Sequence, residues 1–144
     1  MIAVDTNLLV YAHRRDSEWH AVAAGVVRSL AEGAAPWAIP WPCLHEFLAI
    51  VTHPRIYRPA TTIEAALAQG AAWLESPSVV TLAEGSGYSE KLAAVLRESK
   101  ATGPRVHDAR VAALCLYHGV RELWSADRDF SRFAALRVSN PLVG

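Results

Sequence analysis

Short apolar segments alternate with longer segments of helical character along almost the whole chain. The residues IAV at 2–4, WAIP at 37–40 and SVVTL at 78–82 are short and almost entirely apolar, which suits buried strands. A strand followed by a helix and then by another strand is typical of a parallel sheet, because the helix returns the chain to the edge where the next strand begins. We therefore expect an α/β domain with a mainly parallel central sheet of four to five strands flanked by helices.

The segments between these strands carry the signals that start and stop helices. Apolar residues recur at helical spacing from Trp19 to Leu30, and Gly33 follows as a stop. Thr61 or Thr62 is suited to cap a later helix, and Glu64 could complete a capping box there. The helices are expected at 19–30, 43–51, 61–75, 89–101 and 107–119, and two more short strands at 122–124 and 136–141.

The length and composition fit one domain that spans residues 1–144. Apolar residues make up 52% of the chain, which is enough for a sizeable core, and no linker or repeat divides it. Asp5 interrupts the first apolar run and the basic residues follow that run, which is the wrong order for a secretory signal. No apolar stretch approaches the roughly 20 residues that cross a bilayer. We therefore expect a cytoplasmic protein without a membrane segment.

The chain has two cysteines, Cys43 and Cys115, and each lies in an apolar helical pattern. A single cysteine in such a pattern usually acts as a small buried hydrophobe. A disulfide is the weaker alternative in a cytoplasmic protein, and a zinc site is weaker still because no CxxC pair is present.

Acidic residues occur where the predicted strands end and where the predicted helices begin. Glu46 is different, because it lies in WPCLHEFLAIV, a helix that is apolar on several sides, where a charge without a partner would be costly to bury. Ligands of parallel sheets gather at the carboxyl ends of the strands, so residues that follow the first and fourth strands are expected to share one edge. Four of the five aspartates lie at strand ends or helix starts: Asp5, Asp108, Asp127 and Asp129.

Each acid has an ordinary structural explanation when it is taken alone. Asp5 could cap the turn after the first strand, and Asp108 could favour the first turn of its helix. Asp127 or Asp129 could cap the segment RDFSRF. Glu46 could pair with a nearby histidine or arginine. These explanations stay open for each residue considered by itself.

The acids as a set point to a metal ion. Like charges within about 4 Å of one another cost several kcal/mol at intermediate dielectric, so a cluster of these carboxylates needs a cation. Oxygen ligands alone suit Mg²⁺ or Mn²⁺ rather than zinc. Such an ion activates a water and stabilises the charge that develops when a phosphodiester is hydrolysed.

Four motifs carry these acids in a fixed order: VDTNLLVYA at the start, LHEFLAI with its glutamate, HDARVAAL in the second half and SADRDF near the end. The ordered set resembles a PIN-domain ribonuclease, specifically the VapC-type toxin of a type II toxin–antitoxin system. The resemblance covers nearly the whole chain and implies a PIN-like three-layer α/β sandwich. It also implies an Mg²⁺-dependent endoribonuclease, with Mn²⁺ as an alternative ion, that cleaves tRNA, rRNA or mRNA. The implied partners are RNA, a cognate antitoxin that neutralises the toxin, and a second copy of the chain in a homodimer.

The resemblance also implies roles for particular residues. The implied catalytic residues are Asp5, Glu46, Asp108 and Asp127. The implied metal ligands are Asp5, Asp108 and Asp127, and the first two are expected to hold Mg²⁺ most directly. The residues expected to support the pocket are Thr6, Asn7, Ser125 and Asp129, and the resemblance leaves open whether Asp129 contacts the metal.

The net charge of the chain is zero, whereas proteins that bind nucleic acids usually carry a basic excess. Twelve of the fourteen basic residues are arginines, whose planar guanidinium suits phosphate groups. Each could be a solvated surface charge, but together they flank every acidic motif, and we expect a basic rim that draws RNA. Its candidate members are Arg14, Arg15, Arg55, Arg58, Arg105, Arg110, Arg128 and Arg132.

Other functions compete with the endoribonuclease hypothesis. A catalytically silent PIN-like module that binds RNA or protein would be expected to lack one or more acids, and this chain has the full set. An aspartyl-phosphate phosphatase would need a second aspartate two residues after the first, where Asn7 stands. A receiver domain would need a phosphoacceptor aspartate after the third strand, and SVVTLAEG has none. A metal-dependent endoribonuclease is the hypothesis that the acids favour.

Overall fold

The computed structural model describes residues 1–143 and is built around a five-stranded parallel sheet. Its strand order is β3-β2-β1-β4-β5, and each neighbouring pair is parallel. The expected parallel sheet is therefore confirmed. The strands are β1 (Ile2–Val4), β2 (Trp37–Pro40), β3 (Val79–Leu82), β4 (Glu122–Trp124) and β5 (Arg137–Ser139).

Helices connect most of the successive strands. Between β1 and β2 lie α1 (Thr6–His13) and α2 (His20–Glu32). Between β2 and β3 lie α3 (Trp41–Val51) and α4 (Ile63–Leu74). Between β3 and β4 lie α5 (Tyr88–Ser99) and α6 (Arg105–Tyr117). Two short 3₁₀ helices complete the chain, namely η1 (Arg128–Arg132) before β5 and η2 (Pro141–Val143) after it.

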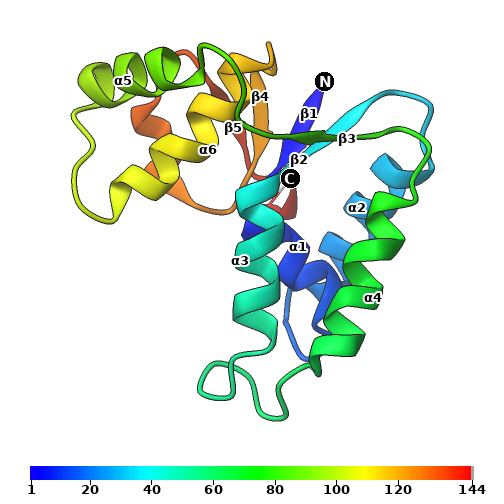
Figure 1. Ribbon diagram of the computed structural model, residues 1–144. Helices are drawn as coiled ribbons and strands as arrows, with labels where there is room; N and C mark the ends of the chain where they lie inside the picture. The colour runs from blue at the N-terminus through cyan, green and yellow to red at the C-terminus, as the bar shows by residue number, and fades with distance from the viewer. Residues whose placement is uncertain (144) are drawn as a thin grey trace.

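The chain reverses its direction across the sheet after β3. Strands β2 and β3 are added on one side of β1, and β4 and β5 on the other. Because parallel crossovers are right-handed, this reversal places α5 and α6 on the face opposite to the earlier helices. Figure 1 shows α5 and α6 on one side of the sheet and α2 and α4 on the other, which confirms the three-layer arrangement. The reversal point lies between β1 and β4, where the carboxyl ends of two strands form the usual place for a ligand.

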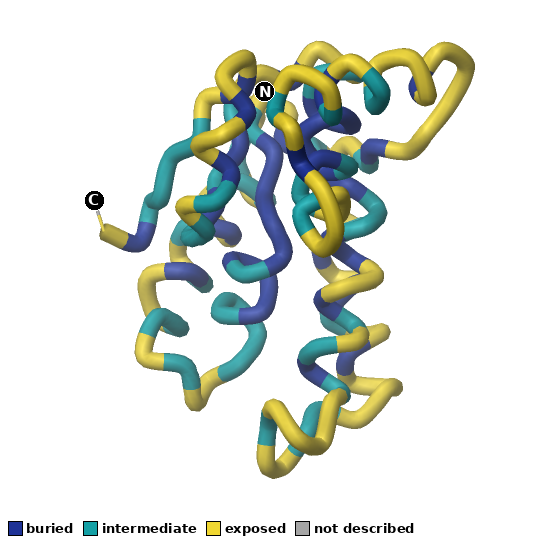
Figure 2. Tube along the Cα trace, turned by 90° about the vertical axis from the view of Figure 1, so that its left-hand side faces the viewer, coloured by how far each residue is buried: buried dark blue, intermediate teal, exposed yellow. Residues whose placement is uncertain are grey.

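The central strands are buried on both faces, as expected of a parallel sheet covered by two layers of helices. Ala3 and Val4 of β1, Ala38 of β2 and Leu123 of β4 are fully buried. Figure 2 shows this buried stretch of the trace between outer helices and loops that are largely exposed. The strand ends that precede the acidic residues therefore start from a rigid, well-packed support.

Helix α1 is absent from the expectations drawn from the sequence. Leu8, Leu9 and Val10 are consecutive and all buried, so no polar face marks a helical period in this segment. Asp5, expected as a possible turn cap, stands at the N-cap of α1, but its side chain makes no capping hydrogen bond there. The carboxylate of Asp5 is left available for other contacts.

The observed starts of α4 and α6 can be compared with the helix starts expected from the sequence. Thr62 is the cap of α4, and its hydroxyl accepts the backbone N–H of Ala65 at 3.1 Å. Glu64 lies one position too early for a capping box, so that expectation is wrong. Helix α6 begins at Arg105, two residues earlier than expected.

Both cysteines are buried and unpaired, as expected. Among residues 1–143, no helix combines the length and the apolar character needed to span a bilayer.

Candidate metal centre

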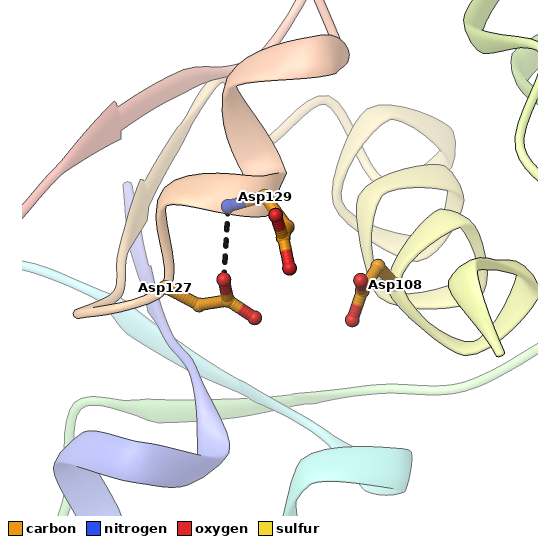
Figure 3. Close-up of side chains that lie close together, drawn as sticks. All are labelled: Asp108, Asp127 and Asp129. Carbon is orange, nitrogen blue, oxygen red and sulfur yellow. Dashed lines mark hydrogen bonds between the residues drawn. The ribbon is translucent and has the colours of Figure 1, made fainter.

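Three carboxylates converge beyond the carboxyl end of β4. Asp108 lies in the first turn of α6, and Asp127 and Asp129 lie at the start of η1. One carboxylate oxygen of each lies within 4.8 Å of the other two. Figure 3 shows the three side chains directed into the same space between η1 and α6. We call these three residues the acidic cluster.

The turn that carries two of these acids is fixed by its own hydrogen bonds. Oδ1 of Asp127 accepts the backbone N–H of Asp129 at 2.8 Å, as the dashed line in Figure 3 marks. The backbone N–H of Asp127 donates to Oγ of Ser125 at 3.0 Å. Asp127, not Asp129, is therefore the cap of η1.

Asp5 lies at the end of β1 and is connected to this turn through Ser125. Its side chain is buried, and it is not one of the three acids that meet within 4.8 Å. The hydroxyl of Ser125 donates to Oδ2 of Asp5 at 2.7 Å, and the oxygen of that hydroxyl accepts the N–H of Asp127. The thiol of Cys43 donates to Oδ1 of Asp5 at 3.5 Å. One hydroxyl group thus joins the carboxylate of Asp5 to the backbone of Asp127.

Asn7 ties helix α1 to the same turn. Its Nδ2 donates to Oγ of Ser125 at 3.4 Å, and its Oδ1 accepts the backbone N–H of Ala126 at 3.2 Å. The hydroxyl of the neighbouring Thr6 is buried and has no hydrogen-bond partner among the described residues. Asn7 and Ser125 therefore fix the ends of β1 and β4 relative to each other.

Burial dominates the electrostatics of Asp5. It raises the pKa of Asp5 to about 6, against an ordinary value of 3.8, because an ionised carboxylate loses its hydration there. Hydrogen bonds from Ser125, the Thr6 backbone and Cys43 lower this pKa, and the nearby charge of Glu46 raises it. Asp5 is thus ionised at neutral pH at an energetic cost.

The pKa of Asp108 is also raised, first by burial and then by the negative charge of Asp127. Asp129 and Glu46 act in the same direction, and Arg105 opposes them. The acids of the cluster therefore repel one another, as expected for carboxylates that share a site.

Glu46 is not buried in the way the sequence suggests. It lies on an exposed face of α3, and it forms no ion pair or hydrogen bond with another described residue. Its charge still acts on both Asp5 and Asp108. It lines an open groove between α3 and α6 together with Pro42, His45, Ala49, His107, Arg110 and Val111.

Three of the candidate arginines are held by other residues. Arg14 pairs with Asp16, donates to the Pro59 carbonyl at 2.9 Å and stacks over the Tyr57 ring at 4.2 Å. It therefore anchors the loop between α3 and α4. Arg110 pairs with Glu84 at 3.1 Å. Arg105 contacts Asp129 and lies 3.9 Å from Asp108. The candidates that lie exposed on the surface are Arg15, Arg55, Arg58, Arg128 and Arg132.

Two contacts of the site are absent from the sequence-based expectations. The sequence predicts Arg105 only as one member of a basic rim, whereas it touches the acidic cluster itself. It predicts Cys43 only as a core residue, whereas the thiol reaches Asp5. The position of Cys43 three residues before Glu46, in the first turn of the same helix, is a signal that could have indicated this contact.

The donor set fits a hard divalent cation. Carboxylate oxygens from the acidic cluster meet at one place, and the carboxylate of Asp5 is joined to the same turn through Ser125. Mg²⁺ usually takes one or two protein carboxylates directly and keeps several waters, which the half-buried position of the cluster allows. The mutual repulsion of these acids is the cost that such an ion would relieve.

The chain is similar in sequence to known proteins over its whole length. A family model described as PIN domain matches residues 2–136. The chain is 35% identical to ribonuclease VapC43 of Mycobacterium tuberculosis over 144 residues, which cover 100% of this chain and 97% of that protein.

Solved structures are similar as well. VapBC2 of Rickettsia felis, bound to a DNA fragment from its promoter, matches with a TM-score of 0.68 at 17% identity, covering 97% of this chain and 98% of that one. VapC20 of Mycobacterium tuberculosis, a sarcin–ricin loop cleaving toxin, matches with a TM-score of 0.66 at 20% identity, covering 91% and 93%. At these identities the two structures support the fold alone.

Proposed function

The chain belongs to the PIN-domain family, among the VapC ribonucleases, and from this premise we propose that it is a metal-dependent endoribonuclease toxin. It hydrolyses phosphodiester bonds within RNA. The observation that carries the proposal is the convergence of Asp108, Asp127 and Asp129 close to a buried Asp5 at the reversal point of the sheet.

The side chains of the site have different roles in the proposed reaction. Asp5, Asp108 and Asp127 would hold Mg²⁺ or Mn²⁺, and Asp129 completes the donor set. The ion supplies a water of lowered pKa and charge that stabilises the phosphoryl transition state. Ser125 holds the carboxylate of Asp5 in place through its 2.7 Å hydrogen bond. Glu46, exposed beside these acids, is suited to accept a proton from the attacking water.

The RNA would approach along the groove that Glu46 lines. The groove also carries His45, His107 and Arg110, which can donate hydrogen bonds to phosphate oxygens. The exposed arginines of the loop between α3 and α4, Arg55 and Arg58, would extend this contact. The local basic side chains would then compensate for the zero net charge of the chain.

We extend the same proposal to the partners. VapC20, to which this chain is similar in fold, cleaves the sarcin–ricin loop, and a structured RNA such as tRNA or rRNA is the substrate class we propose here. A cognate antitoxin would neutralise the toxin, as the similarity to a VapBC assembly supports. The active form would be a homodimer in the cytoplasm, where these RNAs are found.

Removal of the metal tests the activity. EDTA should abolish RNA cleavage, and Mg²⁺ or Mn²⁺ should restore it, because the acids alone provide no nucleophile of comparable strength. Asp5→Asn and Asp108→Asn should both remove cleavage while the fold persists, as circular dichroism would show. Asp16→Asn is the matched control, since Asp16 is exposed and, among residues 1–143, forms an ion pair with Arg14 alone. Mapping of 5′ ends in RNA from cells after a pulse of expression would identify the cleavage sites.

A binding module without catalysis is the second candidate. It would alter RNA function by occupancy, so its effect would survive both substitutions and EDTA. Persistence of new RNA 5′ ends in the Asp5→Asn and Asp108→Asn variants would contradict the proposed mechanism.

A further inference from the structure

The acidic cluster of Asp108, Asp127 and Asp129 is touched by one basic side chain. Arg105 contacts Asp129, and its Nη1 lies 3.9 Å from Oδ2 of Asp108. Among residues 1–143, no other arginine, lysine or histidine forms an ion pair with any acid of the cluster. The guanidinium of Arg105 therefore lies beside the carboxylate oxygens that a metal ion would use.

The position of Arg105 in its helix is unfavourable for a cation. Arg105 is the first residue of α6, and the N-terminus of a helix carries a partial positive charge that favours anions and repels cations. Its side chain is 38% exposed, so it is neither buried by packing nor free in solvent. The attraction of the acids is what holds the guanidinium there.

Arg105 is also the charge that opposes the repulsion within the cluster. Its guanidinium lies beside the carboxylates of Asp108 and Asp129, so its positive charge offsets part of their mutual repulsion. One positive charge against three carboxylates leaves the cluster strongly attractive to a divalent cation.

We propose that Arg105 is a positioning residue that acts as a tethered counter-ion: it bridges Asp108 and Asp129 in the metal-free protein and competes with the metal for their oxygens. The inference rests on the proposed function insofar as the acidic cluster is the metal site. A divalent ion carries twice the charge and can contact several carboxylates at once, so it displaces the guanidinium when its concentration is high enough. Arg105 thereby raises the metal concentration at which the site fills.

The experiment measures binding of Mn²⁺ alone, without RNA, by isothermal titration calorimetry. Arg105→Gln should bind Mn²⁺ about tenfold more tightly than the wild-type chain, because the competing charge is gone. Its melting temperature without metal should be lower, and the rise in melting temperature on adding Mn²⁺ should be larger. Arg105→Lys, which keeps the charge, should behave much like the wild-type chain.

Arg110→Gln is the matched control for metal affinity. It removes the same charge from the same helix, but Arg110 pairs with Glu84 outside the acidic cluster. Its affinity for Mn²⁺ should change by less than about twofold, since Arg110 forms no ion pair with the three acids of the cluster among residues 1–143. If the affinity for Mn²⁺ rises equally in both glutamine variants, the loss of any positive charge on the helix has the same effect, and the proposed competition by Arg105 is overturned.

The outcomes separate this inference from the proposed function. If the wild-type chain binds Mn²⁺ and cleaves RNA but Arg105→Gln binds Mn²⁺ no more tightly, the competition is overturned and the ribonuclease stands. If the wild-type chain binds no Mn²⁺, both fail together. If Arg105→Gln binds Mn²⁺ more tightly but the wild-type chain does not cleave RNA, the result supports the role of Arg105 as a counter-ion and contradicts the proposed ribonuclease activity.

Discussion

The side chain of Asp127 has two opposite effects on the stability of the metal-free protein. Its negative charge lies within 4.8 Å of the other acids of the cluster and destabilises the metal-free protein. Its Oδ1 also accepts the N–H of Asp129 and caps η1, and such caps contribute about 1 kcal/mol. A variant that removes the charge but keeps the acceptor can separate the two effects.

Asp127→Asn is expected to stabilise the metal-free protein, because the amide oxygen can still cap η1 while the repulsion of Asp108 is relieved. Asp127→Ala also loses the cap, so its stability should fall below that of the asparagine variant by about 1 kcal/mol. For a chain of this size that difference corresponds to roughly 2–4 °C in melting temperature. Thermal unfolding in EDTA measures both variants.

Both variants should lose RNA cleavage, and neither should gain stability from added Mg²⁺ to the extent that the wild-type chain does. A lower melting temperature for Asp127→Asn than for the wild-type chain would mean that the carboxylate is needed for the fold. That result would contradict the view that repulsion between Asp127 and the other acids destabilises the metal-free protein.

Single residues also mark the limit of what the sequence can predict. The strand-end positions of Asp5 and Asp127 can be located because apolar runs precede both. The exposure of Glu46 cannot, because the burial of a helical face depends on which neighbours cover it. The contact between Arg105 and Asp129 likewise joins distant parts of the chain, and no local pattern contains it.

At the scale of elements, helix α4 shows how a boundary is chosen between two adjacent threonines. The hydroxyl of Thr62 accepts the N–H of Ala65 and caps the helix. Thr61 serves a different purpose, because its hydroxyl meets His13 and Arg14, from the end of α1 and the residue that follows it. Local propensity favours both threonines equally, and the tertiary contacts of Thr61 decide between them.

Thr62→Ala should therefore destabilise the protein by about 1 kcal/mol, since one N–H at the start of α4 loses its acceptor. Thr62→Ser keeps the hydroxyl and should restore most of the loss. Urea denaturation measures the change, and the midpoint should move without a change in slope. Affinity for Mn²⁺ should stay the same, because Thr62 lies outside the acidic cluster; a weakened affinity would show that α4 supports the metal site.

The strands are easier to predict than the helices, for a physical reason. Strands β1 and β2 are short apolar runs between two covering layers, so they are easily found, whereas the edge strand β5 has the mixed sequence Arg-Val-Ser. Helix α1 is short and buried at Leu8, Leu9 and Val10, so it lacks the alternation of polar and apolar faces that marks a helix. Its existence follows from the packing of α1 against α2 and α3, which the sequence of α1 alone does not contain.

At the scale of the whole molecule, Asp5 links stability to pH. Its pKa is about 6 in the folded chain, whereas the ordinary value of 3.8 applies to the unfolded chain. Between these values the folded state binds more protons, so Asp5 makes the protein more stable as the pH falls from about 6 to about 4. At neutral pH its ionised form costs up to about 3 kcal/mol, an upper bound from the difference in pKa.

Asp5→Asn should therefore stabilise the metal-free protein at pH 7 and reduce the gain in stability between pH 7 and pH 4.5. The raised pKa of Asp108 contributes in the same direction and remains in the variant. Urea denaturation in EDTA across this range measures the effect as the difference between the variant and the wild-type chain. The free energies of unfolding of the two proteins should converge at the acidic end of the range. If they differ by the same amount at every pH, the ionised carboxylate of Asp5 does not cost the stability expected.

The pairing of β1 with β4 has a consequence for how the protein is made. Asp5 is synthesised before Ser125, its hydrogen-bond partner 120 residues further along the chain. A chain that has formed only β1, β2 and β3 has β1 as a free edge, and the carboxylate of Asp5 still lacks its hydrogen bond from Ser125. A catalytic centre that uses Asp5 together with Asp127 is therefore completed only after β4 has been synthesised and has paired with β1.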